Sequence, residues 1–246
     1  MNLKDYPNIL FTFSKISDGN MTILRGDKKK ILNNRKAFLE KIGVDPKRTF
    51  FMNLSHTTKI KTVPDKDLKE GGLNNVDFSK DSEAFDGVVT NEKNIFIFMV
   101  VGDCLPIAFY NPSENKMCLI HASRMNLEGG ILKQTVKQFK NPKDLIVEIG
   151  PSIGPCCYHA FIPKEKRTIG PKLKPYQFET PEGRIGIDLW KFTENELKSM
   201  GVLPANINNP RICTFHSNQY FSHRKFVEKN LELDSRFAVV LGRKDG

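Results

Sequence analysis

The chain has 246 residues, of which 39% are hydrophobic, and this is enough apolar material to bury a full core. Lysine and arginine total 38 against 28 aspartates and glutamates, so the formal net charge is +10, which favours anionic ligands such as phosphate, nucleotides or nucleic acid. At this length we expect one domain that extends over residues 1–246.

Neither export nor membrane insertion is indicated by the sequence. Residues 1–15 lack the apolar core and the cleavage site of a secretory signal. The most apolar stretch, residues 95–110, is interrupted by Gly102, Asp103 and Pro106 and is shorter than the roughly 20 residues that span a bilayer. The five cysteines show no disulfide-scaffold spacing. We therefore expect a cytoplasmic protein with reduced thiols and no membrane segment.

Apolar patterning predicts an α+β chain with mixed α/β character, in which strands outnumber helices. Several predicted strands lack polar alternation, so we expect a single domain with a mixed sheet that is covered on both faces. In chain order, the expected elements are a helix over 28–42, strands over 49–54, 95–101, 104–110 and 117–121, a helix over 130–140, a strand over 145–149, a helix over 189–200, and strands over 211–215 and 236–241.

Boundary residues refine two of these segments. Asp188 is placed as the N-cap of the helix over 189–200, and Gly201 as its C-terminal stop. Residues 163–186 contain several prolines and lysines with little apolar periodicity, which predicts a long surface loop or a loosely paired hairpin.

One arginine lies on the apolar stripe of the first predicted helix. Arg35 follows Ile31 by one helical turn and precedes Phe38 by nearly another, so its guanidinium is directed inward. A buried guanidinium is costly unless it is paired. Arg35 is therefore expected to meet either a structural carboxylate or an anionic ligand, and both interpretations are open.

Three side chains of metal-binding type stand at the ends of predicted strands, namely His56, Cys104 and His121. Strand ends in a covered sheet commonly present groups to one shared cleft. Two imidazoles and one thiolate form a ligand set of catalytic zinc sites, in which the fourth position is left for water or substrate. The alternative interpretation is that Cys104 is a small core residue and that both histidines are hydrogen-bonded structural side chains.

Two carboxylates are close in sequence to these ligand candidates. Asp103 directly precedes Cys104, and both side chains enter one site only if the chain bends there, which Gly102 and Pro106 allow. Asp86 begins an Asp-Gly turn, and on pattern alone it is a turn carboxylate that binds its own backbone.

The remaining thiols and imidazoles give weaker signals. The adjacent cysteines Cys156 and Cys157 could form a strained vicinal disulfide or ligate a metal, but we expect two core thiols in a reducing compartment. No partner for the other histidines is visible in the sequence, and we expect each to be structural. These are His159, His216 and His223.

The order of these motifs resembles that of the laccase-domain (YfiH-like) family, and the resemblance extends from about residue 11 to residue 242. The Asn-Arg pair ends at Arg35, Asp-Gly-x-x-Thr begins at Asp86, Asp-Cys-x-Pro begins at Asp103, and His-Ala begins at His121. Further matches lie at 54–56, 149–158, 213–214 and 220–224. The chain departs from the family where Gly102 replaces an alanine and where the family's Trp-Arg-Gly after the His-Ala pair is missing.

The resemblance implies a CNF1/YfiH-like fold with zinc bound by His56, Cys104 and His121. It also implies that the protein is an enzyme, namely a purine nucleoside phosphorylase that acts on adenosine, inosine or methylthioadenosine with phosphate as co-substrate. The same enzyme is expected to deaminate adenosine. In such an enzyme a guanidinium holds the phosphate, and a metal-bound water has its pKa lowered to about 7.

Roles for individual residues follow from the same resemblance. Arg35 and Arg124 are the candidates for binding phosphate. Asp86 and Asp103 are the candidates for proton transfer or for orienting the metal-bound water, and Cys104 completes the catalytic set.

Three other functions fit part of the pattern. Two histidines, one cysteine and an axial methionine also describe a blue-copper site, hence a copper-dependent polyphenol oxidase, although five histidines are too few for a multicopper cluster. A metal-free hydrolase would use Cys104 as the nucleophile and His121 as its base. A nucleic-acid-binding module is motivated only by the net charge, and because the paired aromatic motifs of an RNA-binding sheet are missing we expect no nucleic-acid partner.

Overall fold

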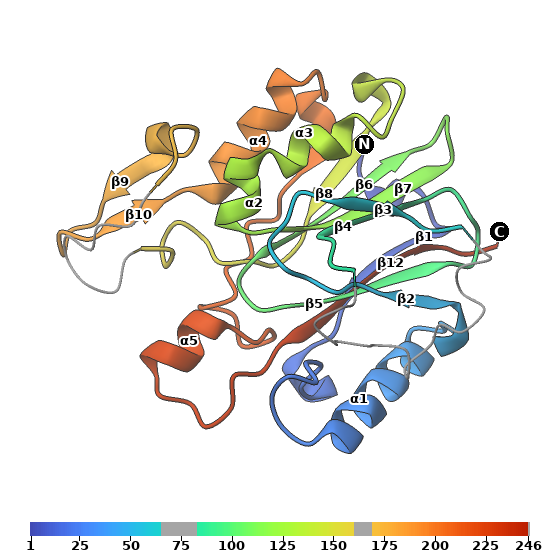
Figure 1. Ribbon diagram of the computed structural model, residues 1–246, viewed down its shortest axis with the longest axis horizontal. Helices are drawn as coiled ribbons and strands as arrows, with labels where there is room; N and C mark the ends of the chain where they lie inside the picture. The colour runs from blue at the N-terminus through green and yellow to red at the C-terminus, as the bar shows by residue number, and fades with distance from the viewer. Residues whose placement is uncertain (65–82, 160–168, 246) are drawn as a thin grey trace.

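The computed structural model describes residues 1–64, 83–159 and 169–245. These residues form four layers, in which helices lie outside two packed sheets (Figure 1). The helices are α1 Lys28–Lys41, α2 Arg124–Gly129, α3 Ile131–Val136, α4 Leu189–Ser199 and α5 His223–Glu228. The strands are β1 Ile9–Phe13, β2 Thr49–Phe51, β3 Ile60–Thr62, β4 Gly87–Thr90, β5 Phe96–Val101, β6 Leu105–Asn111, β7 Lys116–Ala122, β8 Ile146–Ile149, β9 Gln177–Glu179, β10 Ile185–Ile187, β11 Ile207–Asn208 and β12 Phe237–Arg243.

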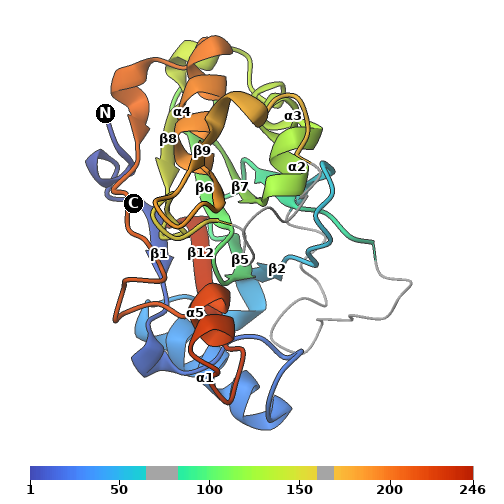
Figure 2. The ribbon, with the colours of Figure 1, turned by 90° about the vertical axis from the view of Figure 1, so that its left-hand side faces the viewer.

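Both large sheets are mixed. The four-stranded sheet has the order β1-β12-β5-β2, with β2 parallel to β5 and the other neighbours antiparallel. The six-stranded sheet has the order β11-β8-β6-β7-β4-β3, with parallel pairs at its two edges and antiparallel pairs between them. Turned by 90°, the molecule shows α2, α3 and α4 toward one end and α1 toward the other (Figure 2).

Strand β6 shows why polar alternation is missing from the sequence. Ile107 and Phe109 pack toward the helical layer of α2, α3 and α4, whereas Ala108 and Tyr110 pack toward the four-stranded sheet together with Val239. Both faces of the strand are therefore apolar. A third cluster buries the inner face of α1 on the outer face of the four-stranded sheet. The expected covered mixed sheet is confirmed, and the structure has two such sheets.

The connection between β5 and β6 carries the chain from one sheet to the other. β5 ends at Val101 in the four-stranded sheet, and β6 begins at Leu105 in the six-stranded sheet. Asp103 adopts φ 86°, a left-handed conformation that reverses the chain within three residues. The predicted bend around Cys104 is confirmed, and it places this residue between the two sheets.

Most expected elements are present with small changes of boundary. The strand expected over 211–215 is wrong: the chain there makes only an isolated parallel bridge, between Cys213 and Ser152. The helix expected over 130–140 is α3, which ends at Val136, and α2 precedes it. Asp188 caps α4 by accepting from the amide of Lys191, as predicted. The segment 163–186 contains the hairpin of β9 and β10, and its residues 163–168 lie outside the described residues.

Within the described ranges, no helix is both long and apolar enough to cross a membrane.

Candidate active site

Asp86 and His121 form a buried pair at the junction of two neighbouring strands. Asp86 directly precedes β4, His121 lies in β7, and the backbone amide of His121 donates to the carbonyl of Asp86 over 2.8 Å. The side chains meet with 2.6 Å between Nδ1 and Oδ1, and their exposed fractions are 4% and 0%. An ionised carboxylate can only accept, so Nδ1 of His121 donates and Nε2 is left available for another partner.

The same carboxylate also fixes the segment that carries His56. Oδ2 of Asp86 accepts from the amides of Ser55 and Thr57, over 3.2 and 2.7 Å. Between them, His56 adopts φ 59°, a left-handed conformation that costs about 1–2 kcal/mol for a residue with a Cβ. The ring of His56 is exposed, and its centroid lies 5.1 Å from that of His121. One aspartate thus brings both predicted histidines to one place.

Cys104 completes the group from the connection between β5 and β6, residues 102–104, which we call the crossing. Its half-buried thiol is adjacent to the imidazole of His121, whose pKa it raises. The structure therefore places His56 and Cys104 each beside His121, although the three residues are far apart in the sequence. Asp86 is not the local turn carboxylate that its Asp-Gly pattern suggests, because its oxygens are used by residues of two other segments.

Electrostatics at this group stabilise charge on the buried pair. Burial alone lowers the pKa of His121, but the thiol of Cys104 and the carboxylate of Asp86 outweigh it and raise the pKa to about 9. Burial alone raises the pKa of Asp86, but the hydrogen bonds from His121, Thr57 and Ser55 outweigh it, so the pKa is lowered. Partial removal of the imidazole of His56 from water, followed by the charge of His121, lowers its pKa, although the residue as a whole is exposed. Asp86 is accordingly ionised at neutral pH.

Asp103 holds the crossing in place. Its Oδ1 accepts from the hydroxyl of Thr214 and its Oδ2 from the amide of Arg224 in α5, each over 2.6 Å. Its carbonyl accepts from the amide of Ile153 over 2.8 Å. These bonds attach the residue before Cys104 to three later segments.

The two arginines expected in the site have different settings. Arg35 lies on the buried face of α1, and its Nε donates to the carbonyl of Met21 over 2.8 Å. Its guanidinium lies 5.3 and 5.5 Å from the ring centroids of Phe51 and Phe98. Burial lowers its pKa to about 10. In the described part of the chain it forms no ion pair, and its Nη1 has no hydrogen-bond partner. Arg124 is half-buried in the first turn of α2, three residues after the metal-ligand candidate of β7.

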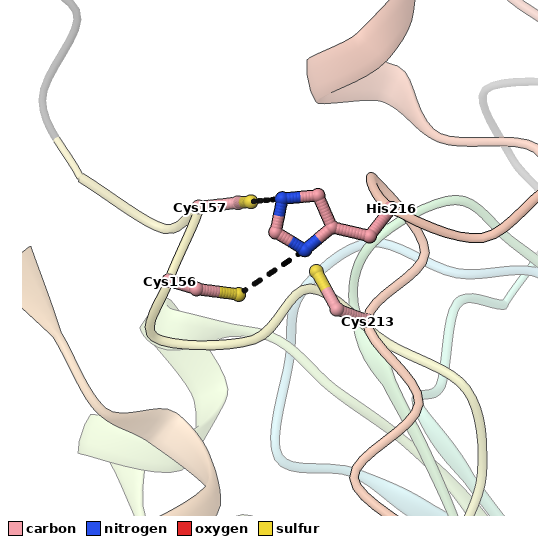
Figure 3. Close-up of side chains that lie close together, drawn as sticks. All are labelled: Cys156, Cys157, Cys213 and His216. Atoms are coloured by element: carbon pink, nitrogen blue, oxygen red, sulfur yellow. Dashed lines mark hydrogen bonds between the residues drawn. The ribbon is translucent and has the colours of Figure 1, made fainter.

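A second group of thiols was not expected from the sequence. Cys156, Cys157, Cys213 and His216 converge from two loops, with their ligand atoms all within 4.8 Å of one another (Figure 3). Cys156 is exposed, so the expectation of two core thiols is wrong for this residue, and His216 has sulfur partners. The Cys-x-x-His spacing from Cys213 to His216 is the signal that could have revealed the group.

A family model described as multi-copper polyphenol oxidoreductase laccase matches residues 13–238. The chain belongs to this family. Among family members, purine nucleoside phosphorylase YlmD of Geobacillus stearothermophilus is 29% identical over 228 residues, which cover 89% of this chain and 81% of the relative. Purine nucleoside phosphorylase of Haemophilus influenzae is 28% identical over 207 residues, covering 81% and 78%. The laccase-domain resemblance expected from the motifs is confirmed.

Solved structures of the family show the same fold. The crystal structure of YlmD from Geobacillus stearothermophilus has a TM-score of 0.82 at 25% identity, covering 98% of this chain and 93% of that chain. The crystal structure of the Bacillus licheniformis hypothetical protein YfiH has a TM-score of 0.80 at 21% identity, covering 99% and 96%. The α+β fold with mixed sheets is therefore shared with the YfiH-like proteins, as expected.

Proposed function

We propose that this protein is an enzyme, a zinc-dependent purine nucleoside phosphorylase that uses His56, Cys104 and His121 as its metal ligands. The observation that carries the proposal is the contact of His121 with Asp86 on one side and with Cys104 on the other. Relatives in the same family are named purine nucleoside phosphorylases, which supports a purine nucleoside and phosphate as the substrates.

The chemistry of the donor set fits zinc. Zinc favours nitrogen and sulfur ligands, and a carboxylate that accepts from Nδ1 of a ligating imidazole fixes the ring and makes Nε2 more basic. Asp86 makes this contact with His121 over 2.6 Å, and the ring of His56 is adjacent. Three protein ligands leave a fourth position open, and a zinc ion held by them would supply a Lewis acid for the negative charge that develops on the departing purine.

The chain's own residues would bind phosphate and hold the ligands in place. In phosphorolysis a phosphate oxygen bonds to C1′ of the ribose while the bond to the purine nitrogen breaks, and the purine leaves with the electron pair. Arg124 is close in sequence to His121 and is our candidate for holding the phosphate by charge-assisted hydrogen bonds. Nη1 of Arg35 is a buried donor that an anion oxygen would satisfy.

We assign both carboxylates to positioning. Asp86 orients His121 and the segment around His56, and Asp103 holds the crossing that ends in Cys104. The oxygens of both carboxylates already accept short hydrogen bonds from the protein. Loss of either carboxylate would therefore change the reaction by displacing the metal ligands.

The experiment compares the wild type with Cys104→Ala. Zinc content is measured by elemental analysis, and release of the purine base from adenosine, inosine and methylthioadenosine is followed with and without phosphate. We expect about one zinc fewer per chain and no base release in Cys104→Ala. Cys118→Ala, which removes a buried thiol of β7 outside the site, is the matched control and should keep both. Base release that needs no phosphate would contradict phosphorolysis.

Adenosine deamination at the same site is a second part of the proposal. It predicts that inosine forms from adenosine in the absence of phosphate, and that Cys104→Ala abolishes this reaction together with phosphorolysis.

Copper in place of zinc would give the purified protein an intense blue colour from its thiolate, and a colourless zinc protein would contradict a copper oxidase.

One observation favours a second candidate function. The thiol of Cys104 lies beside His121, whose pKa is raised to about 9, and a cysteine nucleophile beside its base has the same arrangement. A Cys-His hydrolase predicts rapid alkylation of Cys104 that added zinc does not slow. A metal ligand predicts that zinc protects this thiol.

A further inference from the structure

The Cys156, Cys157, Cys213 and His216 cluster is built from two loops that meet beside α5. The first loop follows β8 and carries the adjacent pair Cys156 and Cys157. The second carries Cys213 and His216 in Cys-x-x-His spacing. The imidazole lies between the two adjacent cysteines, with Nδ1 3.7 Å from Sγ of Cys156 and Nε2 3.4 Å from Sγ of Cys157 (Figure 3).

Either of these separations has the length of a nitrogen–sulfur edge of a zinc tetrahedron, and the imidazole would use one of its two nitrogens. Bonds of about 2.3 Å to sulfur and about 2.1 Å to nitrogen, at tetrahedral angles, place nitrogen and sulfur about 3.6 Å apart. The ligand atoms of all four residues lie within 4.8 Å of one another, so closing the shell needs only rotation of side chains. Cys156 and His216 are exposed, which gives an ion a route into the site.

The two loops are joined by their backbones. The amide of Ser152 donates to the carbonyl of Ile212, and the amide of Thr214 donates to the carbonyl of Ser152, over 3.1 and 3.0 Å. The hydroxyl of Ser152 accepts from the indole of Trp190 in α4 over 2.7 Å. Because these bonds do not involve the four side chains, the cage is preorganised before any ion binds.

One backbone contact suits a thiolate at Cys213. The amide of Gly154 donates to Sγ of Cys213 over 3.3 Å, and an amide pointed at sulfur stabilises its ionised form. Three thiolates and one imidazole around Zn²⁺ carry a net charge of −1.

We propose that Cys156, Cys157, Cys213 and His216 form a second, closed zinc site whose role is structural. On binding, the three thiols give their protons to solvent and the imidazole contributes one nitrogen, so the protein supplies all four ligands and no position remains for substrate. The ion would lock together the two loops that hold Asp103 through Ile153 and Thr214, and in this way it would steady the crossing that carries Cys104.

Metal stoichiometry tests the site without reference to activity. In the Cys104→Ala background, we expect one zinc per chain to remain, and we expect Cys156→Ser or His216→Ala to remove it. Both residues are exposed, so these substitutions should leave folding intact. His159→Ala, which removes a histidine of the same loop outside the cluster, is the matched control and should keep the ion.

A spectroscopic measurement identifies the ligands. Co²⁺ loaded into Cys104→Ala should show the absorption of tetrahedral cobalt with thiolate ligands, and the spectrum should change in Cys213→Ser and His216→Ala. A metal-free Cys104→Ala protein after purification in zinc would overturn the proposal. So would a disulfide between Cys213 and either adjacent cysteine in protein purified under reducing conditions, detected by mass spectrometry. Because all variants carry Cys104→Ala, failure here is distinguishable from failure of the proposed active site.

Discussion

The hydroxyl of Thr214 donates a 2.6 Å hydrogen bond to Oδ1 of Asp103, a residue that precedes it by 111 positions. Both residues are buried, with exposed fractions of 0% and 8%. Cys104 directly follows Asp103, so the position of its thiol depends on a contact with a distant part of the chain. The crossing between the two sheets is therefore held by a hydrogen bond from a loop that belongs to neither sheet.

Removing this hydroxyl should destabilise the protein. In Thr214→Val, Oδ1 of Asp103 stays buried without its donor, and we expect the free energy of unfolding to fall by about 1–3 kcal/mol. Thr193→Val is the control, because Oγ1 of Thr193 is buried with no hydrogen-bond partner in the described ranges and its loss should be neutral or stabilising. Urea unfolding of both variants measures the difference, and equal stabilities would refute the role of the contact.

Asp86 should control metal affinity through His121. Asp86→Asn removes the charge and leaves one acceptor oxygen, so its NH2 group must face either Nδ1 of His121 or the amides of Ser55 and Thr57. One of these contacts is lost, and we expect zinc affinity to fall by about 10- to 100-fold. Competition with a chelator measures the affinity. Asp234→Asn is the matched control, since Asp234 also contacts an imidazole, that of His223, but outside the proposed site. A variant at Asp86 that keeps zinc as tightly as the control would remove Asp86 from the site.

Gly102 lies so close to Arg236 that there is no room for a side chain. A Cβ on Gly102 would lie 2.4 Å from Cδ and 2.9 Å from Nε of Arg236. The guanidinium of Arg236 is held by two hydrogen bonds to Asp234, so it cannot move away freely. We expect Gly102→Ala to lower the free energy of unfolding by about 1–3 kcal/mol.

A double-mutant cycle tests this explanation. In an Arg236→Ala background the added methyl group meets no side chain at that position, and the cost of Gly102→Ala should largely disappear. Chemical denaturation of the four proteins in the cycle provides the coupling energy. Additive effects of the two substitutions would show that the clash with Arg236 is not the cause.

The strands could be predicted from the sequence, but their assignment to two sheets could not. The apolar runs of β5 and β6 are buried on both faces, and burial of this kind has the same pattern whichever sheet a strand joins. The bend between them was visible because Gly102 and Pro106 flank it. The short edge strands, such as β3 and β11, could not be predicted, because their pairing depends on the neighbouring strands and not on the apolar pattern of their own few residues.

The candidate site shows the same division. The residue types of His56, Cys104 and His121 were evident, and the structure places the first two beside His121. The role of Asp86 was not visible, because its partners lie 29 to 35 positions away and local pattern suggests a turn. The second thiol cluster was missed for a similar reason, since the two halves of its ligand set are separated by nearly 60 positions.

Asp234 makes stability depend on pH. Burial alone raises the pKa of its carboxyl, but the hydrogen bonds and charge of Arg236, together with those of His223, outweigh burial, and the pKa is lowered. A carboxyl with a lowered folded-state pKa stabilises the protein above its unfolded pKa of about 3.9, and this contribution is lost as the pH falls through the folded value. At neutral pH, Asp234→Asn should therefore lower the free energy of unfolding by about 1–3 kcal/mol.

The pH profile separates this ionic contribution from packing. We expect the difference in stability between the wild type and Asp234→Asn to be constant above about pH 5 and to shrink as the pH falls below about 4. The comparison is made in a His223→Gln background, so that titration of the neighbouring imidazole does not contribute. Denaturant unfolding at a series of pH values measures the difference. If it stays constant into the acid range, the loss in Asp234→Asn comes from packing, and the ion pair with Arg236 contributes no net stability.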